Sequence, residues 1–370
     1  MPAIIVFFLL FILPFLIAPF GITEFENPKV IVGEAGIILL FFFSFLTNKF
    51  TFRYRAQQVL LYAVIVVLTV IDLIFFRTHL SFFGNVFRMQ GIFLLWLLLL
   101  FSLLSANISQ KSVSWLIYGL LLLAELIAVF FLPLNASQRY VGTMGEPNAL
   151  AAFAVFLWPF AFFAIKKFGM KEKVGIALIL FIVCLLLFFS TSRSAMIAFG
   201  IQLICIGLYK YKMLLPKIVL ICTICYLASY MFPFYEHNLY ESRVEVWQSA
   251  LAAGSTHPFI GNGFGNTEFV LHTAAARLGL PIQYYYIDSS HNIFLDWWVQ
   301  GGIIGIGGLL GLVYLTFKGL IKEENIRELV VAFGLVTVLS FNPASVVGLL
   351  GFWWVIGQGL KNNKSPVNSL

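Results

Sequence analysis

Apolar residues fill most of the chain in runs long enough to cross a membrane, and short polar stretches separate the runs. A spanning helix needs about 20 predominantly apolar residues. The pattern therefore predicts an all-α polytopic membrane protein with about 12 transmembrane helices. The predicted spans are 3–22, 29–47, 58–76, 91–105, 113–133, 147–166, 173–190, 194–209, 214–232, 292–318, 328–341 and 344–360. The runs at 91–105 and 328–341 are short, which leaves open whether each is tilted, re-entrant or merged with a neighbour.

One polar interval, at residues 233–290, is much longer than the others and is rich in Tyr, His, Gly and Asn. The predicted organisation is transmembrane helices over 1–232, an extracytoplasmic loop carrying short helices over 233–290, transmembrane helices over 291–360 and a polar tail at 361–370. Residues 1–20 lack a basic start and a small-residue cleavage site, so they are predicted to be the first span and not a signal peptide.

Composition narrows the class of protein. The chain is 61% hydrophobic and only 11% charged, whereas ordinary globular chains carry about 25% charged residues. A soluble enzyme, a nucleic-acid-binding protein and a disordered chain are excluded. The cysteines lie inside apolar runs, and Cys222-x-x-Cys225 has no His or third thiol nearby. Buried apolar thiols are therefore predicted, with no disulfide framework, metal site or cofactor.

Basic residues alternate between the two sides of the predicted spans. Most fall in loops that would be cytoplasmic if both termini are cytoplasmic, which places the long loop outside. The cations on the inner side are mostly lysines. Those on the outer side are Lys29, Arg77, Arg88, Arg139, Arg193, Arg243 and Arg277. Arginine binds phosphate or carboxylate with a fixed, two-pronged geometry, so the outer arginines are expected either to form a phosphate site or to pair structurally with acids such as Glu146 and Asp288.

Charged residues within apolar runs are candidates for function. Arg193 lies between two spans, and its alternatives are a functional role or an Arg that snorkels to the headgroups or caps a helix. Four buried acids are expected to act as structural counter-ions of the outer arginines: Glu34, Asp72, Glu125 and Asp296.

The long loop opens with a predicted helix that has Arg243 in its first turn. Val244, Trp247, Ala250 and Leu251 follow helical spacing and would form its apolar face. A tight turn follows at His257-Pro-x-x-Gly261-x-Gly263-x-Gly265, and its glycines would let a phosphate approach backbone N–H groups.

The loop closes at His291, where the next span begins. A histidine at this boundary can be neutral at physiological pH and accept a proton from an attacking hydroxyl. The alternative is an interfacial His beside an aromatic belt of Trp297 and Trp298.

Taken together, these segments resemble the O-antigen ligase and polymerase family of membrane transferases. The stretch Gly-Thr-x-x-Glu-Pro-Asn within 141–151 is similar to the family's Gly-Thr-x-x-Asn-Pro-Asn, with Glu146 in place of Asn. Ser-Arg-Ser-Ala at 192–195 is similar to its Ser-Arg-Gly-Ala. Arg243-x-x-x-Trp247 with the turn after His257, and His291-Asn292 followed after nine residues by Gly-x-x-Gly, complete the likeness over about 140–305.

The resemblance implies a metal-independent, inverting glycosyltransferase that takes a glycan from undecaprenyl diphosphate on the outer face of the cytoplasmic membrane. It implies that Arg193 and Arg243 bind the diphosphate and stabilise the leaving group. It assigns His291 as general base and Asn292 as a residue that orients the site. Further substrate-binding candidates are Asn148, His257, Gly261 and Gly263 in the matching segments, with Arg277 and Arg139 added for their charge and outer placement.

Three functions stay open on these observations. A ligase would pass a finished glycan to a glycan or lipid acceptor such as lipid A-core, whereas a polymerase would add repeats to a growing chain. A transporter or flippase is the rival of another class, but transporters gather their polar residues near the bilayer midplane. The polar residues here gather at the outer edge. The expected partners are the lipid-linked donor, the acceptor and membrane lipid, without nucleic acid.

Overall fold

The computed structural model describes residues 1–47, 56–108, 113–135, 138–165, 169–210, 243–284 and 287–361. Within these ranges the chain is helical, and an isolated antiparallel bridge joins Leu134 to Tyr140. The predicted ninth span at 214–232, with Cys222 and Cys225, lies outside the described residues, as does nearly all of the tail at 361–370. The other predicted spans each correspond to a helix, and the short fourth and eleventh are separate helices.

The helices follow one another along the chain with short connections. The N-terminal helix continues from α1 through a π-turn and a 3-10 turn to Phe15. The elements are α1 (Pro2–Phe7), α2 (Glu26–Leu46), α3 (Ala56–Phe75), α4 (Ile92–Ala106), α5 (Trp115–Phe131), η3 (Gly142–Met144), α6 (Pro147–Phe163), α7 (Met170–Ser190), α8 (Arg193–Lys210), α10 (Arg243–Gly254), α11 (Thr267–Leu278), η4 (Pro281–Tyr284), α12 (Ile293–Lys322), α13 (Ile326–Leu339) and α14 (Val346–Leu360).

The outer surfaces of the bundle are apolar. Large side chains such as Phe45, Phe75 and Phe131 are 65%, 71% and 83% exposed, and so much exposed apolar surface marks contact with lipid or protein. Four helices are long and apolar enough to span a membrane: Glu26–Leu46, Gln57–Phe75, Met170–Ser190 and Ile293–Lys322. Shorter apolar helices accompany them. The chain is a multi-pass membrane protein, and the number and orientation of its spans stay predictions.

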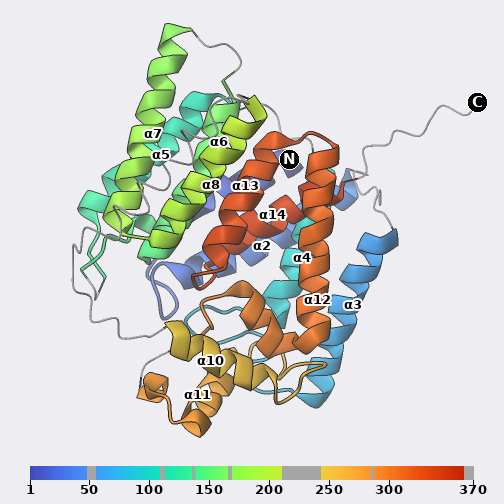
Figure 1. Cartoon of the computed structure of the whole chain (residues 1–370). Coiled ribbons are helices and arrows are strands. Elements are labelled where there is room, and N and C mark those ends of the chain that lie inside the picture. The colour runs from blue at the N-terminus through green and yellow to red at the C-terminus, as the bar shows by residue number, and fades with distance from the viewer. Residues whose placement is uncertain are drawn as a thin grey trace, which may run out of the picture.

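The interior of the bundle is built around α6 and α14. Every residue of α6 from 149 to 161 is buried, as are Trp353 and Trp354 of α14. Glycines let neighbouring helices approach closely, as is common between membrane helices. A Cβ on Gly357 would lie 2.1 Å from the carbonyl oxygen of Ser102 in α4, and one on Gly319 of α12 would lie 1.8 Å from that of Gly359. These contacts fix α4, α12 and α14 side by side (Figure 1).

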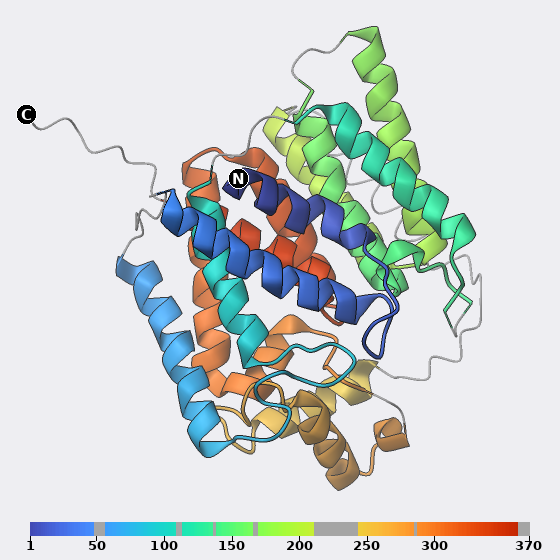
Figure 2. The same ribbon diagram turned by 180° about the vertical axis from the view of Figure 1, so that it is seen from behind.

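The polar segments gather at one end of the bundle. Here α10 and α11 pack on each other and on the first half of α12, beside the loop of residues 76–91 that joins α3 to α4 (Figures 1 and 2). Their small core includes Val246, Ala250, Leu271, Ala275 and Val299. The described part of the predicted long loop is therefore folded and helical, and it is packed against the helices that flank the candidate site.

Candidate active site

His291 lies in a constrained turn immediately before α12, which we call the His-bearing turn (residues 288–292). Its φ is +56°, a left-handed conformation that residues other than glycine rarely adopt. Hydrogen bonds hold the turn: Ser290 N donates to Asp296 Oδ1 at 2.7 Å, and Ser290 Oγ donates to the carbonyl of Asn292 at 2.9 Å. His291 is 8% exposed. Strained conformations of this kind are kept where the surroundings enforce them, often at functional sites.

Asn292 caps the helix that follows the turn. Its Oδ1 accepts hydrogen bonds from Phe294 N at 2.9 Å and Leu295 N at 3.3 Å, which satisfies two of the backbone donors left free at a helix start. The side chain that the motif places next to His291 therefore fixes where α12 begins, and it acts on the site by orienting the turn.

Two arginines from distant segments surround His291 with positive charge. Arg243 is the first residue of α10, and Arg88 belongs to the 76–91 loop. Burial, followed by the charges of Arg243 and Arg88, lowers the pKa of the His291 imidazole well below 6.5. His291 is therefore neutral near pH 7 and has a lone pair available to accept a proton.

Arg88 was not among the site residues predicted from the sequence. It forms an ion pair with Asp288 in the His-bearing turn and lies 3.7 Å from Glu146. Structural pairing, one of the two alternatives for the outer arginines, is thus the arrangement found for Arg88. Glu146, which departs from the family motif, supplies part of it. No motif surrounds Arg88 in the sequence, and the only signal was its place among the outer arginines.

Arg139 and Asn148, which were both predicted to bind substrate, lie next to each other. The Arg139 Nη2 donates to Asn148 Oδ1 at 3.4 Å, and its Nε and Nη2 donate to the carbonyl of Ser190 at 3.0 and 2.5 Å. Arg139 is close enough to Arg243 for their charges to interact. Since its guanidinium also holds the end of α7, Arg139 has a structural role in addition to any contact with a ligand.

Arg193 begins α8, directly after the turn whose Ser190 carbonyl binds Arg139. Its side chain is exposed. The adjacent Ser194 accepts a hydrogen bond from Asn342 Nδ2, which ties the start of α8 to the segment between α13 and α14. Arg193 therefore stands at the same end of the bundle as Arg139, on a helix terminus that is anchored to its neighbours.

Arg277 and His257 lie at exposed positions. Arg277 is in the last turn of α11, and the positive charges that lower the pKa of His291 come from Arg243 and Arg88 instead. His257 packs edge-on against Phe76, with ring centroids 5.2 Å apart, and its Nδ1 lies 2.9 Å from Asn262 Oδ1. The structure gives His257 a role in shaping the glycine-rich turn.

The glycine-rich turn after His257 forms backbone hydrogen bonds with α12 at a point where that helix is interrupted. The helix is interrupted at Gly302, whose φ and ψ are 56° and −153°. Ile303 N donates to the carbonyl of Pro258 at 2.8 Å, and Gly263 N donates to that of Gln300 at 3.0 Å. The N–H of Gly261 is also used within the chain, by the carbonyl of His257 at 2.8 Å. These two glycines are needed for the fit of the turn against the break, and their N–H groups are already engaged.

We expect Gly302→Ala to destabilise the protein. An alanine at φ 56° is strained, at a cost of about 1–3 kcal/mol, and its Cβ would lie 2.6 Å from the carbonyl carbon of Phe259. The midpoint of thermal unfolding in detergent should fall. In the control Gly307→Ala, in the same helix, the new Cβ has no neighbour within 4 Å, so the midpoint should stay or rise slightly. Equal midpoints would contradict this role of Gly302.

Buried acids were expected to hold the outer arginines, but the partners found for Asp72 and Glu125 are not arginines, whereas Asp296 is close enough to Arg88 for their charges to interact. Asp72 accepts a hydrogen bond from Phe264 N at 3.3 Å, and Asp296 accepts one from Ser290 N. Glu125 accepts from Thr143 N and Thr143 Oγ1 at 2.8 and 2.6 Å. Each of the three carboxylates accepts a backbone hydrogen bond from a loop that carries a predicted motif, because those loops are buried against the helices and need internal acceptors.

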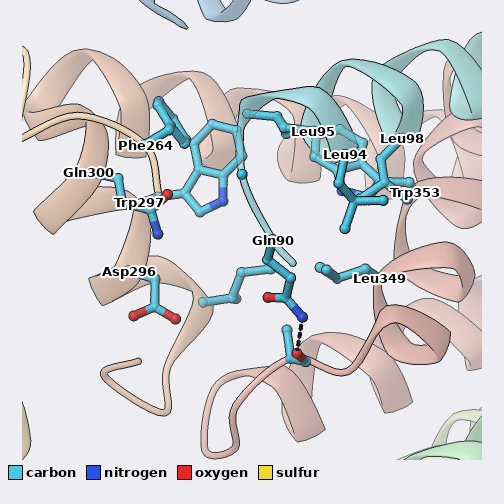
Figure 3. Close-up of a pocket in the computed structure, with 13 residues that line it drawn as sticks. Gln90, Leu94, Leu95, Leu98, Phe264, Asp296, Trp297, Gln300, Leu349 and Trp353 are labelled. Atoms are coloured by element: carbon cyan, nitrogen blue, oxygen red, sulfur yellow. Dashed lines mark hydrogen bonds between the residues drawn. The ribbon is translucent and has the colours of Figure 1, made fainter. Parts of the chain in front are cut away.

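A cavity of about 80 Å³ adjoins the charged group, between the start of α4, the first half of α12 and α14 (Figure 3). Gln90, Asp296 and Gln300 are its polar lining residues, and leucines and aromatic residues form most of the remaining wall. Gln90 Nε2 donates to the carbonyl of Ala344 at 2.7 Å, and Arg88 Nη1 approaches the same carbonyl at 3.4 Å. Arg88 thus lies next to Ala344, a residue of the cavity wall.

The fold and this group of residues define a multi-pass membrane protein with a buried histidine and several arginines at one end of a helical bundle. Residues 177–310 match the family model described as O-Antigen ligase. That segment contains Arg193, Arg243 and His291. The match confirms the resemblance of the motifs that lie in residues 177–310, and this part of the chain is similar to the O-antigen ligase family.

The chain is also similar to the ComP-specific O-oligosaccharyltransferase of Acinetobacter baylyi (strain ATCC 33305 / BD413 / ADP1). The two are 22% identical over 295 residues, which cover 70% of this chain and 53% of that protein. The chain thus spans about half the length of this curated relative.

Proposed function

We propose that the protein transfers a glycan from undecaprenyl diphosphate to the hydroxyl of an acceptor. The observation that carries the proposal is the buried His291 in its left-handed turn, beside the charges of Arg243 and Arg88. The match of residues 177–310 to the O-antigen ligase family model and the likeness to an O-oligosaccharyltransferase support it. The relative's name specifies an O-linked product, in keeping with a hydroxyl acceptor.

In the proposed reaction, His291 takes the proton of the acceptor hydroxyl as that oxygen attacks the anomeric carbon of the first sugar. The bond from this carbon to the diphosphate oxygen breaks, and the configuration inverts. Arg243 and Arg193 bind the diphosphate and stabilise the charge that develops on it as it leaves. Asn292 orients the His-bearing turn, and the mechanism proposed for these residues needs no metal ion.

Binding of the donor would raise the pKa of His291, the proposed general base. Without ligand, burial and the charges of Arg243 and Arg88 keep the pKa of His291 low. A bound diphosphate carries negative charge into the same region, which favours the protonated imidazole and raises its pKa. His291 would then be a better proton acceptor once the donor is in place, which links donor binding to the chemical step.

The test uses purified protein in lipid with an undecaprenyl-diphosphate-linked oligosaccharide, and it follows the release of undecaprenyl diphosphate. Release that requires a separate acceptor supports a ligase that passes glycan to lipid A-core or a similar acceptor. Chains that lengthen from donor alone indicate a polymerase. An intact donor under all conditions contradicts glycosyl transfer and favours a transporter or flippase.

We further propose that both termini are cytoplasmic and that the site faces the periplasm. Positions 269 and 170 test this by cysteine labelling. Phe269 in α11 is 67% exposed and Met170 at the start of α7 is 77% exposed. The end of α7 at Ser190 contacts Arg139 at the site. With about 1.5 Å per residue, Met170 lies roughly 30 Å away, towards the other side.

In a variant without the four native cysteines, we expect an impermeant thiol reagent outside intact cells to modify Phe269→Cys and to spare Met170→Cys. Both should react after permeabilisation, which controls for accessibility. Modification of position 170 alone in intact cells would reverse the orientation and place the site in the cytoplasm.

A further inference from the structure

The His-bearing turn is held from two sides. On one side Asp296 of α12 accepts the Ser290 N–H at 2.7 Å. On the other side Asp288 forms the ion pair with Arg88, and the Asp288 side chain is only 9% exposed. A left-handed residue such as His291 keeps its conformation only where its surroundings enforce it. Of these two contacts, the Arg88 pair joins the turn to a segment outside α12.

Arg88 is itself fixed by several segments that are far apart in the sequence. Its backbone N–H donates to Asn85 Oδ1 at 2.8 Å, and its guanidinium lies 3.7 Å from Glu146 before α6. Its Nη1 approaches the carbonyl of Ala344 between α13 and α14 at 3.4 Å. Arg88 therefore joins the ends of several helices at the point where the His-bearing turn meets the bundle.

A buried polar network stands behind this junction. Glu26, at the start of α2, accepts a hydrogen bond from Val346 N at 2.6 Å and is close enough to Arg88 and Lys29 for their charges to interact. Lys29 is 1% exposed and donates to the carbonyl of Thr143 at 2.6 Å. Removing one member of such a network leaves its partners buried and unpaired, so its members resist displacement. The network gives Arg88 a rigid support.

We propose that Arg88 is a positioning residue for His291, because it holds the His-bearing turn through its ion pair with Asp288. This inference rests on the proposed function for its effect on the reaction, but its effect on His291 itself is independent of any activity. Arg88 touches no reacting atom in this scheme. It acts through the place and the protonation state of the base.

The charged groups around the His-bearing turn come from four elements. Arg243 stands on α10, Arg88 on the 76–91 loop, Asp296 on α12 and Asp288 on the turn itself. Burial is the largest cause of the low His291 pKa, followed by Arg243 and then Arg88. Because a nearby cation disfavours the protonated imidazole, removal of Arg88 should raise the His291 pKa. Loss of Asp288 leaves the cation in place and should not raise it.

The experiment compares Arg88→Gln and Asp288→Asn with the control Arg77→Gln, an exposed arginine of the same loop. The His291 pKa is measured in lipid-reconstituted protein from the pH dependence of deuterium exchange at C2 of the imidazole, followed by mass spectrometry of the peptide. We expect Arg88→Gln to raise that pKa by about one pH unit. Asp288→Asn and the control should leave it low.

Turnover is measured on the same samples with the donor used above. Misplacing a catalytic group by about 1 Å can cost on the order of a hundredfold in rate. We therefore expect Arg88→Gln and Asp288→Asn each to lower kcat by about tenfold to a hundredfold, with the KM for donor little changed. The acid limb of the pH profile should move up only in Arg88→Gln.

The outcomes separate this inference from the proposed function. If wild type releases no undecaprenyl diphosphate but Arg88→Gln still raises the His291 pKa, glycosyl transfer is wrong and the assignment of Arg88 stands. If the protein is active and the His291 pKa is the same in wild type and Arg88→Gln, the assignment is overturned. An Asp288→Asn variant with wild-type kcat would likewise overturn the positioning role.

Discussion

Replacing His291 by glycine is expected to lower the release of undecaprenyl diphosphate by at least about a hundredfold. A positioned general base contributes about 10²–10⁴-fold, and glycine has no side chain that can accept the proton. Glycine suits this position better than alanine, because φ is +56° there and glycine adopts this region without steric cost. The backbone of the His-bearing turn should therefore persist, and the loss should report on the imidazole itself. The measurement is the rate of release at saturating donor and acceptor.

Two controls make this result specific. His79→Gly removes an exposed histidine from the 76–91 loop and should leave the rate near that of wild type. Imidazole added to His291→Gly should restore part of the activity, because the space left by the side chain lies beside the reacting hydroxyl. A His291→Gly variant with the wild-type rate would remove His291 from the reaction and leave the histidine as an interfacial residue.

The helices could be predicted from the sequence because an apolar run of about 20 residues in a bilayer has few alternatives to a helix. The packing partners of each helix could not be predicted in this way. The helix predicted at Arg243 is present as α10, but its predicted face is wrong in part: Val244 and Leu251 are 60% and 54% exposed, whereas Val246 and Ala253 are buried. The helical period allows both faces, and packing against α11 and α12 selects between them.

Some residues of the candidate site could likewise be predicted from the sequence and others could not. His291 and Arg243 could be found because each lies in a short local pattern, and the structure brings the charge of one to bear on the other. Arg88 could not, because its partner Asp288 is 200 positions away and no local pattern marks either residue. The break at Gly302 was also hidden, since the apolar run continues through it. The glycine-rich turn after His257 is the sequence feature related to this break, but the relation is visible only from the backbone hydrogen bonds between the turn and α12.

Arg243→Lys is expected to lower kcat/KM by about a hundredfold although the charge is kept. Arg243 begins α10, on a helix whose buried face is packed against α11 and α12, so the guanidinium extends from a fixed backbone. Guanidinium binds two phosphate oxygens in one plane, whereas an ammonium binds as a point charge. Loss of a donor to developing charge costs about 10²–10³-fold in other enzymes. The measurement is kcat/KM for the lipid-linked donor.

The lysine variant also separates geometry from charge. Since the positive charge near His291 remains, the His291 pKa should stay well below 6.5, as it does beside Arg243, and only the rate should fall. Arg243→Gln removes both, so it should lower the rate and raise that pKa together. Arg77→Lys is the matched control in an exposed arginine and should be fully active. If Arg243→Lys kept the wild-type kcat/KM, charge alone would be sufficient at this position, and the two-pronged binding of the leaving diphosphate would be wrong.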